Sequence, residues 1–212
     1  MQIRISPDKL RSAANEQITI MNEIEKSAAA MDQIEERLRA SWEGVAGRQI
    51  RSIVETTKVA VQKLAEEVQE SAQDLNETAR AFESIDNLNG SNYRTLHIIP
   101  GIFNNIIPSP IRPMILDFVI FQSGEIRIVP DEVREIAAEC KREANEIEEK
   151  KARFRVIVNK MRDDWEGNSC NKYMEGVEDI IRAFDEVIDS ISEMADKMNM
   201  AANRYEEIDN TL

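Results

Sequence analysis

The side chains that most often perform chemistry in proteins are few in this sequence, and their spacing does not bring them together. The single histidine, His97, has no cysteine, serine or acidic partner at the spacing of a metal site or a catalytic triad. A predicted helix separates Cys140 from Cys170 by roughly 35 Å, which is too far for a disulfide. No glycine-rich phosphate loop occurs. We therefore predict no enzymatic activity, no catalytic residue, no metal site and no cofactor.

The aromatic residues are more informative. A Trp-Glu-Gly tripeptide occurs twice, beginning at Trp42 and at Trp165. A tryptophan between two helices can shield the last layer of an apolar core, and a glycine two residues later can adopt the positive φ with which a chain reverses. Shielding of the core is the simplest interpretation of such a tryptophan. Recognition by a partner is the alternative, and one side chain can serve both roles.

The two tripeptides belong to an internal repeat, which is revealed when the sequence is shifted by 123 residues, from Trp42 to Trp165. The alignment pairs residues 3–8 with 126–131 and continues without a gap to Asn87 and Asn210, with roughly a third of the pairs identical. We therefore divide the chain into a first unit, residues 1–87, a linker, residues 88–125, and a second unit, residues 126–212.

Two long amphipathic helices are predicted in each unit, one on each side of the tryptophan. Apolar residues recur there at steps of three and four, which lays an apolar stripe along each helix. In the first unit the stripes include Leu10, Ala14, Ile24, Ile34, Leu38, Val54, Val61, Leu64, Val68, Leu75 and Phe82. Pro7 and Pro130 suit the first position of a helix, where no amide donor is needed. Each unit is thus predicted to be a helical hairpin.

A single hairpin of this length would leave a continuous apolar face in contact with water, so the hairpins must be covered. We predict an all-α fold in which the two hairpins pack as a four-helix bundle, and antiparallel packing would place the turn of one hairpin beside the termini of the other. The linker is long enough for pairing within one chain. Exchange of hairpins between two chains, giving a homodimer, would bury the same surfaces and remains an alternative.

The linker, residues 88–125, is rich in isoleucine, phenylalanine and proline, unlike a flexible spacer. The segment 118–121, the turn candidate 122–124 and the segment 125–129 together favour a short β-hairpin, to which residues 1–5 could add a strand. The favoured interpretation is that the linker packs along the bundle and shields its seam. The less favoured alternative is that the linker contacts a partner or a membrane.

Composition excludes several kinds of partner and of export. The chain carries 27 Lys and Arg against 40 Asp and Glu, so its net charge of −13 makes nucleic acid a poor partner. The N-terminus has no basic start followed by an apolar stretch and a cleavage site, so no cleaved signal peptide is expected. Prolines and charges interrupt the most apolar stretch, and no membrane-spanning segment is predicted.

In its unit size, its tryptophan turn between two striped helices, and the Tyr-Xaa-Xaa-Xaa-Asp tail at Tyr205 and Asp209, the chain resembles the Trp-Xaa-Gly (WXG) proteins similar to early secreted antigenic target. The resemblance covers both units and implies type VII secretion. It also implies dimerisation of hairpins as antiparallel bundles, export without a cleaved signal peptide, and localisation outside the bacterial cell.

The resemblance further implies a two-part export signal, in which the tryptophan turn of one hairpin lies beside the tyrosine tail of its partner and is bound by the secretion ATPase. Carried over to this chain, the signal is formed by Trp42, Gly44, Tyr205 and Asp209. A second copy would be formed by Trp165, Gly167, Phe82 and Asp86. This copy is degenerate because the phenyl ring of Phe82 has no hydroxyl with which to donate a hydrogen bond.

The predicted function is that of a type VII secretion substrate or targeting partner, a fused pseudo-dimer that travels alone or escorts an effector. Its predicted partners are the secretion ATPase and a co-secreted effector or another WXG protein. The alternative is a cytosolic helical adaptor or chaperone for a secreted partner. Both functions require the same acidic bundle, and they differ in whether the protein leaves the cell.

Overall fold

The computed structural model describes residues 6–87 and 127–209. These residues form the helices α1 (Pro7–Ser41), α2 (Val45–Asn87), α3 (Pro130–Asp164) and α4 (Asn168–Asp209). The predicted all-α fold is confirmed. The N-terminal segment 1–5, the segment 118–124 of the predicted β-hairpin, His97 and the rest of the linker lie outside the described residues.

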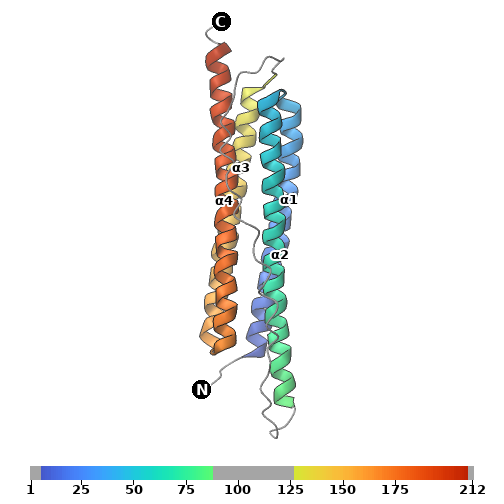
Figure 1. Cartoon of the computed structure of the whole chain (residues 1–212), viewed down its shortest axis with the longest axis vertical. Helices are drawn as coiled ribbons and strands as arrows, with labels where there is room; N and C mark the ends of the chain where they lie inside the picture. Colours follow the sequence, from blue (N-terminus) through green and yellow to red (C-terminus); the bar gives the residue numbers. More distant parts are fainter. Residues whose placement is uncertain (1–5, 88–126, 210–212) are drawn as a thin grey trace.

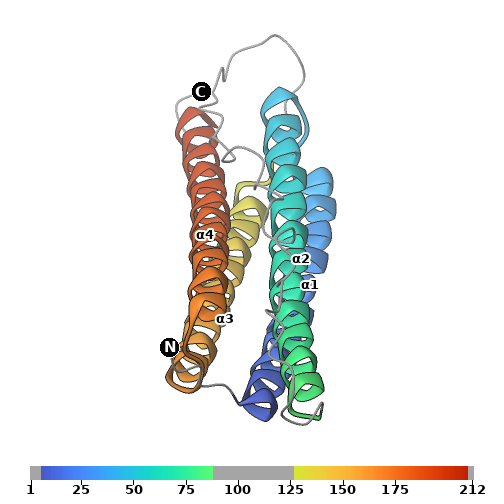
Figure 2. The same cartoon turned by 60° about the horizontal axis from the view of Figure 1, so that its bottom comes forward.

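The helices form two antiparallel hairpins that pack against each other, as predicted (Figure 1). Helix α1 packs against α2 within the first hairpin, and α3 packs against α4 within the second. Between the hairpins, α1 contacts α3 and α2 contacts α4 (Figure 2). The turn between α1 and α2 therefore lies at the same end of the bundle as the beginning of α3 and the end of α4. The turn between α3 and α4 lies at the opposite end.

The ends of the helices follow from a few local residues. Pro7 and Pro130 are the first residues of α1 and α3, where a missing amide hydrogen costs nothing. Gly44 and Gly167 precede α2 and α4 with φ angles of 105° and 129°. Residues with a Cβ rarely adopt such angles, so each glycine allows the chain to reverse within three residues. The predicted positions of both turns are confirmed.

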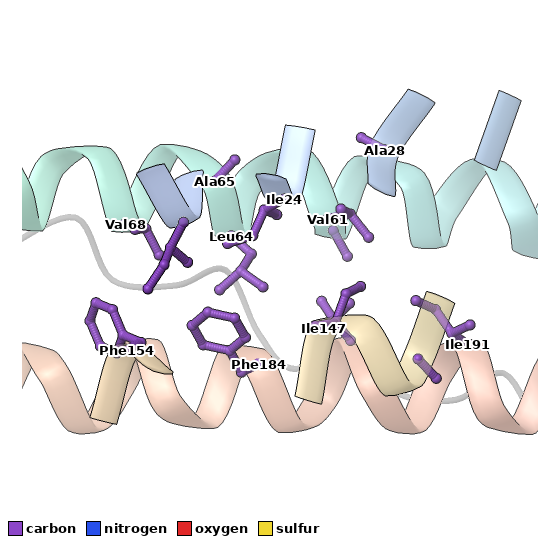
Figure 3. Close-up of a cluster of buried hydrophobic side chains, with 14 of the residues drawn as sticks. Ile24, Ala28, Val61, Leu64, Ala65, Val68, Ile147, Phe154, Phe184 and Ile191 are labelled. Atoms are coloured by element: carbon purple, nitrogen blue, oxygen red, sulfur yellow. The ribbon is translucent and has the colours of Figure 1, made fainter. Parts of the chain in front are cut away.

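The core lies along the seam between the hairpins. Side chains of the first hairpin, including Ile24, Leu64 and Val68, face Ile147 and Phe184 of the second (Figure 3). All five are buried, and the ring centroids of Phe154 and Phe184 are 5.9 Å apart. Each hairpin thus covers the apolar face of the other, which is the burial that drives the assembly.

One ion pair recurs in both hairpins. Arg11 of α1 binds Glu83 of α2, with 2.5 Å between guanidinium and carboxylate, and Arg134 of α3 binds Glu206 of α4. A shift of 123 residues converts the first pair into the second. Each pair joins the start of one helix to the end of its neighbour, so the repeat preserves this contact within the hairpin.

A polar cluster interrupts the apolar core between the hairpins. The hydroxyl of Tyr173 on α4 accepts a hydrogen bond of 2.8 Å from the amide of Gln17 on α1 and lies 2.8 Å from the hydroxyl of Ser71 on α2. All three residues are buried, with Gln17 fully so. Burial raises the pKa of Tyr173 to about 12. The cluster therefore stays neutral and ties α4 to both helices of the other hairpin.

A carboxyl group on α2 lies close to this cluster. Burial raises the pKa of Asp74 to about 6, and the charges of Glu77 and Glu70 contribute to the rise. A raised carboxyl pKa means that the folded chain binds a proton more tightly than the unfolded chain does. Asp74 consequently lowers stability at neutral pH, and this loss disappears as the pH falls through 6 towards 4.

We expect the Asp74→Asn variant to be more stable than the original chain at pH 7, because the amide does not ionise. Its advantage should shrink as the pH falls from about 6 to about 4, since Asp74 of the original chain then becomes protonated. Urea unfolding of both proteins across this pH range, followed by circular dichroism, measures the difference. A constant difference between the two proteins would contradict this account, and Asp196→Asn, an exposed position on α4, is the control.

Candidate recognition ends of the bundle

The bundle has two ends, and each combines a tryptophan turn with the end of a long helix. Helices α2 and α4 have 43 and 42 residues, against 35 in α1 and in α3, so they extend past their neighbours at opposite ends (Figure 1). The end that holds Trp42 and Gly44 also holds the last turns of α4, with Tyr205 and Asp209. We call it the first end.

The first tryptophan turn is joined to the second hairpin by backbone hydrogen bonds. Trp42 forms an isolated antiparallel bridge with Ile128, just before α3. The N–H of Glu43 donates to the carbonyl of Arg127 at 2.7 Å, and the N–H of Val129 donates to the carbonyl of Ser41 at 2.9 Å. These two bonds fix the start of α3 against the α1–α2 turn and so set the register of the hairpins.

The Trp42 side chain is fully buried at this turn, and its carbonyl group is closely surrounded. The guanidinium of Arg51 donates to that carbonyl at 2.9 Å. Gly47 lies so near that an added Cβ would collide with the carbonyl oxygen and lie 3.1 Å from the carbonyl carbon. The backbone of Trp42 is therefore held by α2, while its ring shields the core. The predicted shielding role is confirmed.

The tail of α4 presents a different surface. Tyr205 is half-buried against the core, and its burial raises the pKa of the phenol. Asp209 is exposed. The guanidinium of Arg134 binds the carboxylate of Glu206 and the amide oxygen of Asn203, the latter at 3.1 Å, which holds this part of α4 on α3. The tail is thus a fixed helix end with a partly exposed phenol ring.

The opposite end, here called the second end, has a related but altered arrangement. Trp165 is buried, and its ring packs on Tyr173 with centroids 5.6 Å apart. Gly167 completes the turn, and Phe82 is half-buried in the last turns of α2, where Asp86 also falls. A hollow of about 640 Å³ lies beside the turn and is lined by Asn159, Arg162, Asp163, Trp165, Glu166, Gly167, Cys170 and Asn171.

Both indole rings bury an N–H group that has no acceptor among the described residues. A buried donor without a partner costs free energy, so burial of the rings must outweigh this cost. Cys140 and Cys170 are buried free thiols, each with a pKa that burial raises, so neither is an activated nucleophile. The two ends are suited to recognition by contact and not to covalent chemistry.

Within residues 6–87 and 127–209 no cluster of three or more metal-binding side chains occurs. In the same part of the chain, none of the helices is long and apolar enough to cross a membrane.

Two Trp-Xaa-Gly helical hairpins that cover each other define a class of small non-enzymatic helical proteins. The chain belongs to the WXG100 family, described as proteins of 100 residues with WXG, because the family model matches residues 2–87 and 125–210. Membership makes this a tandem protein of the type VII secretion family and places it among the substrates of that secretion system. The comparisons found no matching curated protein and no matching solved structure.

Several residues that shape the two ends were not predicted from the sequence. The bridge between Trp42 and Ile128 falls within the segment 125–129, for which a strand was predicted, but its partner is the tryptophan turn. Gly47 and Arg51 also had no predicted role. A departure from the repeat could have indicated them, because the equivalent positions in the second unit hold residues of a different type, Cys170 and Met174.

We expect Gly47→Ala to destabilise the chain by about 1–3 kcal/mol, because the new Cβ pushes against backbone atoms that cannot move aside cheaply. Cys170→Ala, at the equivalent position of the second hairpin, is the matched control and should cost less, since that position already holds a Cβ. Urea unfolding measured by circular dichroism gives both values. An unchanged or increased stability of Gly47→Ala would show that the turn is not packed as described.

Proposed function

We propose that the protein is exported by a type VII secretion system through a signal at the first end of the bundle, formed by Trp42, Gly44, Tyr205 and Asp209. In this proposal the chain is made in the bacterial cytoplasm, folds as a pseudo-dimer from the units 1–87 and 126–212, and leaves the cell without cleavage of a signal peptide. The secretion ATPase is the partner that binds the first end.

The observation that carries the proposal is the shared end of the bundle. Trp42 comes from the first hairpin and Tyr205 from the second, and the antiparallel packing brings the turn of one and the tail of the other to one end (Figure 1). Trp42 is buried, so a binding protein would meet the surface of the turn and not the indole ring. The half-buried phenol of Tyr205 and the exposed carboxylate of Asp209 are accessible to it.

We assign the second end a structural role. Phe82 takes the place of Tyr205 there, and a phenyl ring has no hydroxyl with which a partner could form a hydrogen bond. Trp165 packs at a tilt against Tyr173, whose hydroxyl accepts a hydrogen bond from the buried Gln17. The second tryptophan is therefore part of the interior cluster, and the support for a single functional signal is the missing hydroxyl of Phe82.

Escort of a co-secreted effector is the finer part of the proposal. The apolar faces of the two hairpins are buried against each other, so the bundle would bind an effector through the exposed surfaces of the bundle. A cytosolic adaptor would have the same fold. Appearance of the protein outside the cell in a manner that depends on the secretion ATPase distinguishes export from adaptor function.

We predict that Tyr205→Ala abolishes export while the bundle stays folded. The phenol is only half-buried, so its loss should cost less than the several kcal/mol of a core truncation. Immunoblots of culture supernatant and cell lysate measure export in cells with and without the secretion ATPase, and circular dichroism of the purified variant measures folding.

Phe82→Ala is the matched control, because this residue occupies the equivalent position at the second end. Its export should be undiminished. Normal export of Tyr205→Ala, or equal loss of export in both variants, would refute the assignment of the signal to the first end. Secretion that does not depend on the ATPase would refute the proposed export route itself.

A further inference from the structure

One ion pair within the hairpins recurs in both of them, whereas the ion pairs that Arg37 forms between the hairpins have no equivalent. The pairs Arg11–Glu83 and Arg134–Glu206 are related by the shift of 123 residues. In contrast, Arg37 of α1 binds Glu132 and Glu139 of α3 at 2.9 and 2.6 Å. The shift converts these residues into Lys160, Lys9 and Glu16, so the equivalent arrangement would keep one carboxylate and replace the other by a second cation.

The polar cluster is one-sided in the same way. The equivalents of Gln17, Ser71 and Tyr173 are Cys140, Met194 and Ile50, and all three are buried. The bundle therefore has a hydrogen-bonded cluster near the second end and apolar side chains at the related positions near the first end. Two equal hairpins could not produce this difference, because symmetry would give both ends the same residues.

A residue at the centre of the seam shows the same divergence. Ser27 of α1 and Lys150 of α3 are equivalents under the shift, and they contact each other with 3.3 Å between hydroxyl and ammonium. They therefore lie where the pseudo-twofold axis crosses the α1–α3 seam. Lys150 is only 6% exposed. Its ammonium also binds Glu146 of the same helix at 3.4 Å. In a pair of two second hairpins Lys150 would face a second copy of itself, and the two ammonium groups would repel each other across the seam despite these counterions.

We propose that the two hairpins are complementary halves, each of which binds the other and rejects a second copy of itself. A pair of first hairpins would bury Gln17 and Ser71 against Ile50 and bring Arg37 close to Lys9. A pair of second hairpins would bury the hydroxyl of Tyr173 against sulfur atoms, which are weak acceptors, and oppose two copies of Lys150. Each polar group that is buried without a hydrogen-bond partner raises the free energy of a pair of identical hairpins. The pair of different hairpins is therefore favoured because its competitors are destabilised.

The partner that fits each hairpin face is therefore the other hairpin, from the same chain or from a second copy by exchange. A hairpin from another protein fits only if it supplies the matching polar residues. This inference does not depend on the proposed export signal, because it concerns the seam and not the ends.

The test uses the full chain with a site-specific protease site inserted in residues 88–126, cut after folding so that both hairpins stay together. Isotope-labelled and unlabelled cut protein are mixed, unfolded in urea and refolded. Native mass spectrometry then counts unlike and like pairs. If the hairpins did not discriminate between partners, about half of the complexes would be unlike pairs, each made of one first and one second hairpin. We expect unlike pairs to exceed like pairs by about tenfold or more, and a statistical mixture would overturn the proposal.

A variant tests the two residues assigned to exclusion. Lys150→Ser combined with Tyr173→Ile gives the second hairpin apolar or neutral contacts, so its self-pairs should rise by about tenfold. Lys151→Ser is the matched control, because this neighbouring buried lysine binds Asp185 within its own hairpin at 2.7 Å. No rise in self-pairs of the double variant, or an equal rise in the control, would contradict the assignment.

A measurement on the uncut chain is independent of refolding after cleavage. Tyr173→Phe should raise the equilibrium constant for unfolding by about tenfold, because Gln17 and Ser71 lose their buried partner. In a Gln17→Leu, Ser71→Ala background the same change should have little effect. Equal losses in both backgrounds, measured by urea unfolding, would show that the cluster does not select the partner.

Discussion

The fold depends on one constraint, which is that neither hairpin can leave its apolar face in water. The faces meet along the seam of α1 with α3 and of α2 with α4, where Leu64 and Phe184 are buried. Burial of this seam supplies the nonspecific part of the stability. It does not by itself choose a register or a partner, since apolar stripes of similar spacing could slide past one another. The polar contacts supply that choice.

Much of this arrangement could be predicted from the sequence because helical periodicity and the repeat are strong signals. Apolar residues at steps of three and four define which face of each helix is buried, and Pro7 and Gly44 mark a start and a turn. The pairing of Tyr173 with Gln17 could not be predicted, because periodicity identifies a buried position without naming its neighbour. The role of Ile128 was missed for the same reason, since a bridge to Trp42 depends on the packing of the hairpins.

The candidate ends divide in a similar way. The sequence indicates both tryptophans and the tyrosine tail, the need to cover the stripes predicts that the hairpins pair, and the resemblance to WXG proteins predicts that they do so antiparallel. The burial of the two indole rings was predicted as a packing role, and both rings are buried. Their different surroundings were not predictable: Trp42 is bridged to the segment just before α3, whereas Trp165 packs at a tilt against Tyr173. These differences arise from residues that the repeat does not share.

Fusion of two hairpins in one chain explains why such differences can exist. In a dimer of identical hairpins, a substitution at one end appears at the other end as well, so a gain at the first must be tolerated at the second. A single chain removes that restriction, and each end can change alone. Gly47 and Arg51 can then hold the first turn, while Cys170 and Met174 occupy the second. The same freedom allows a hydrogen-bonded cluster at one end of the seam and an apolar layer at the other.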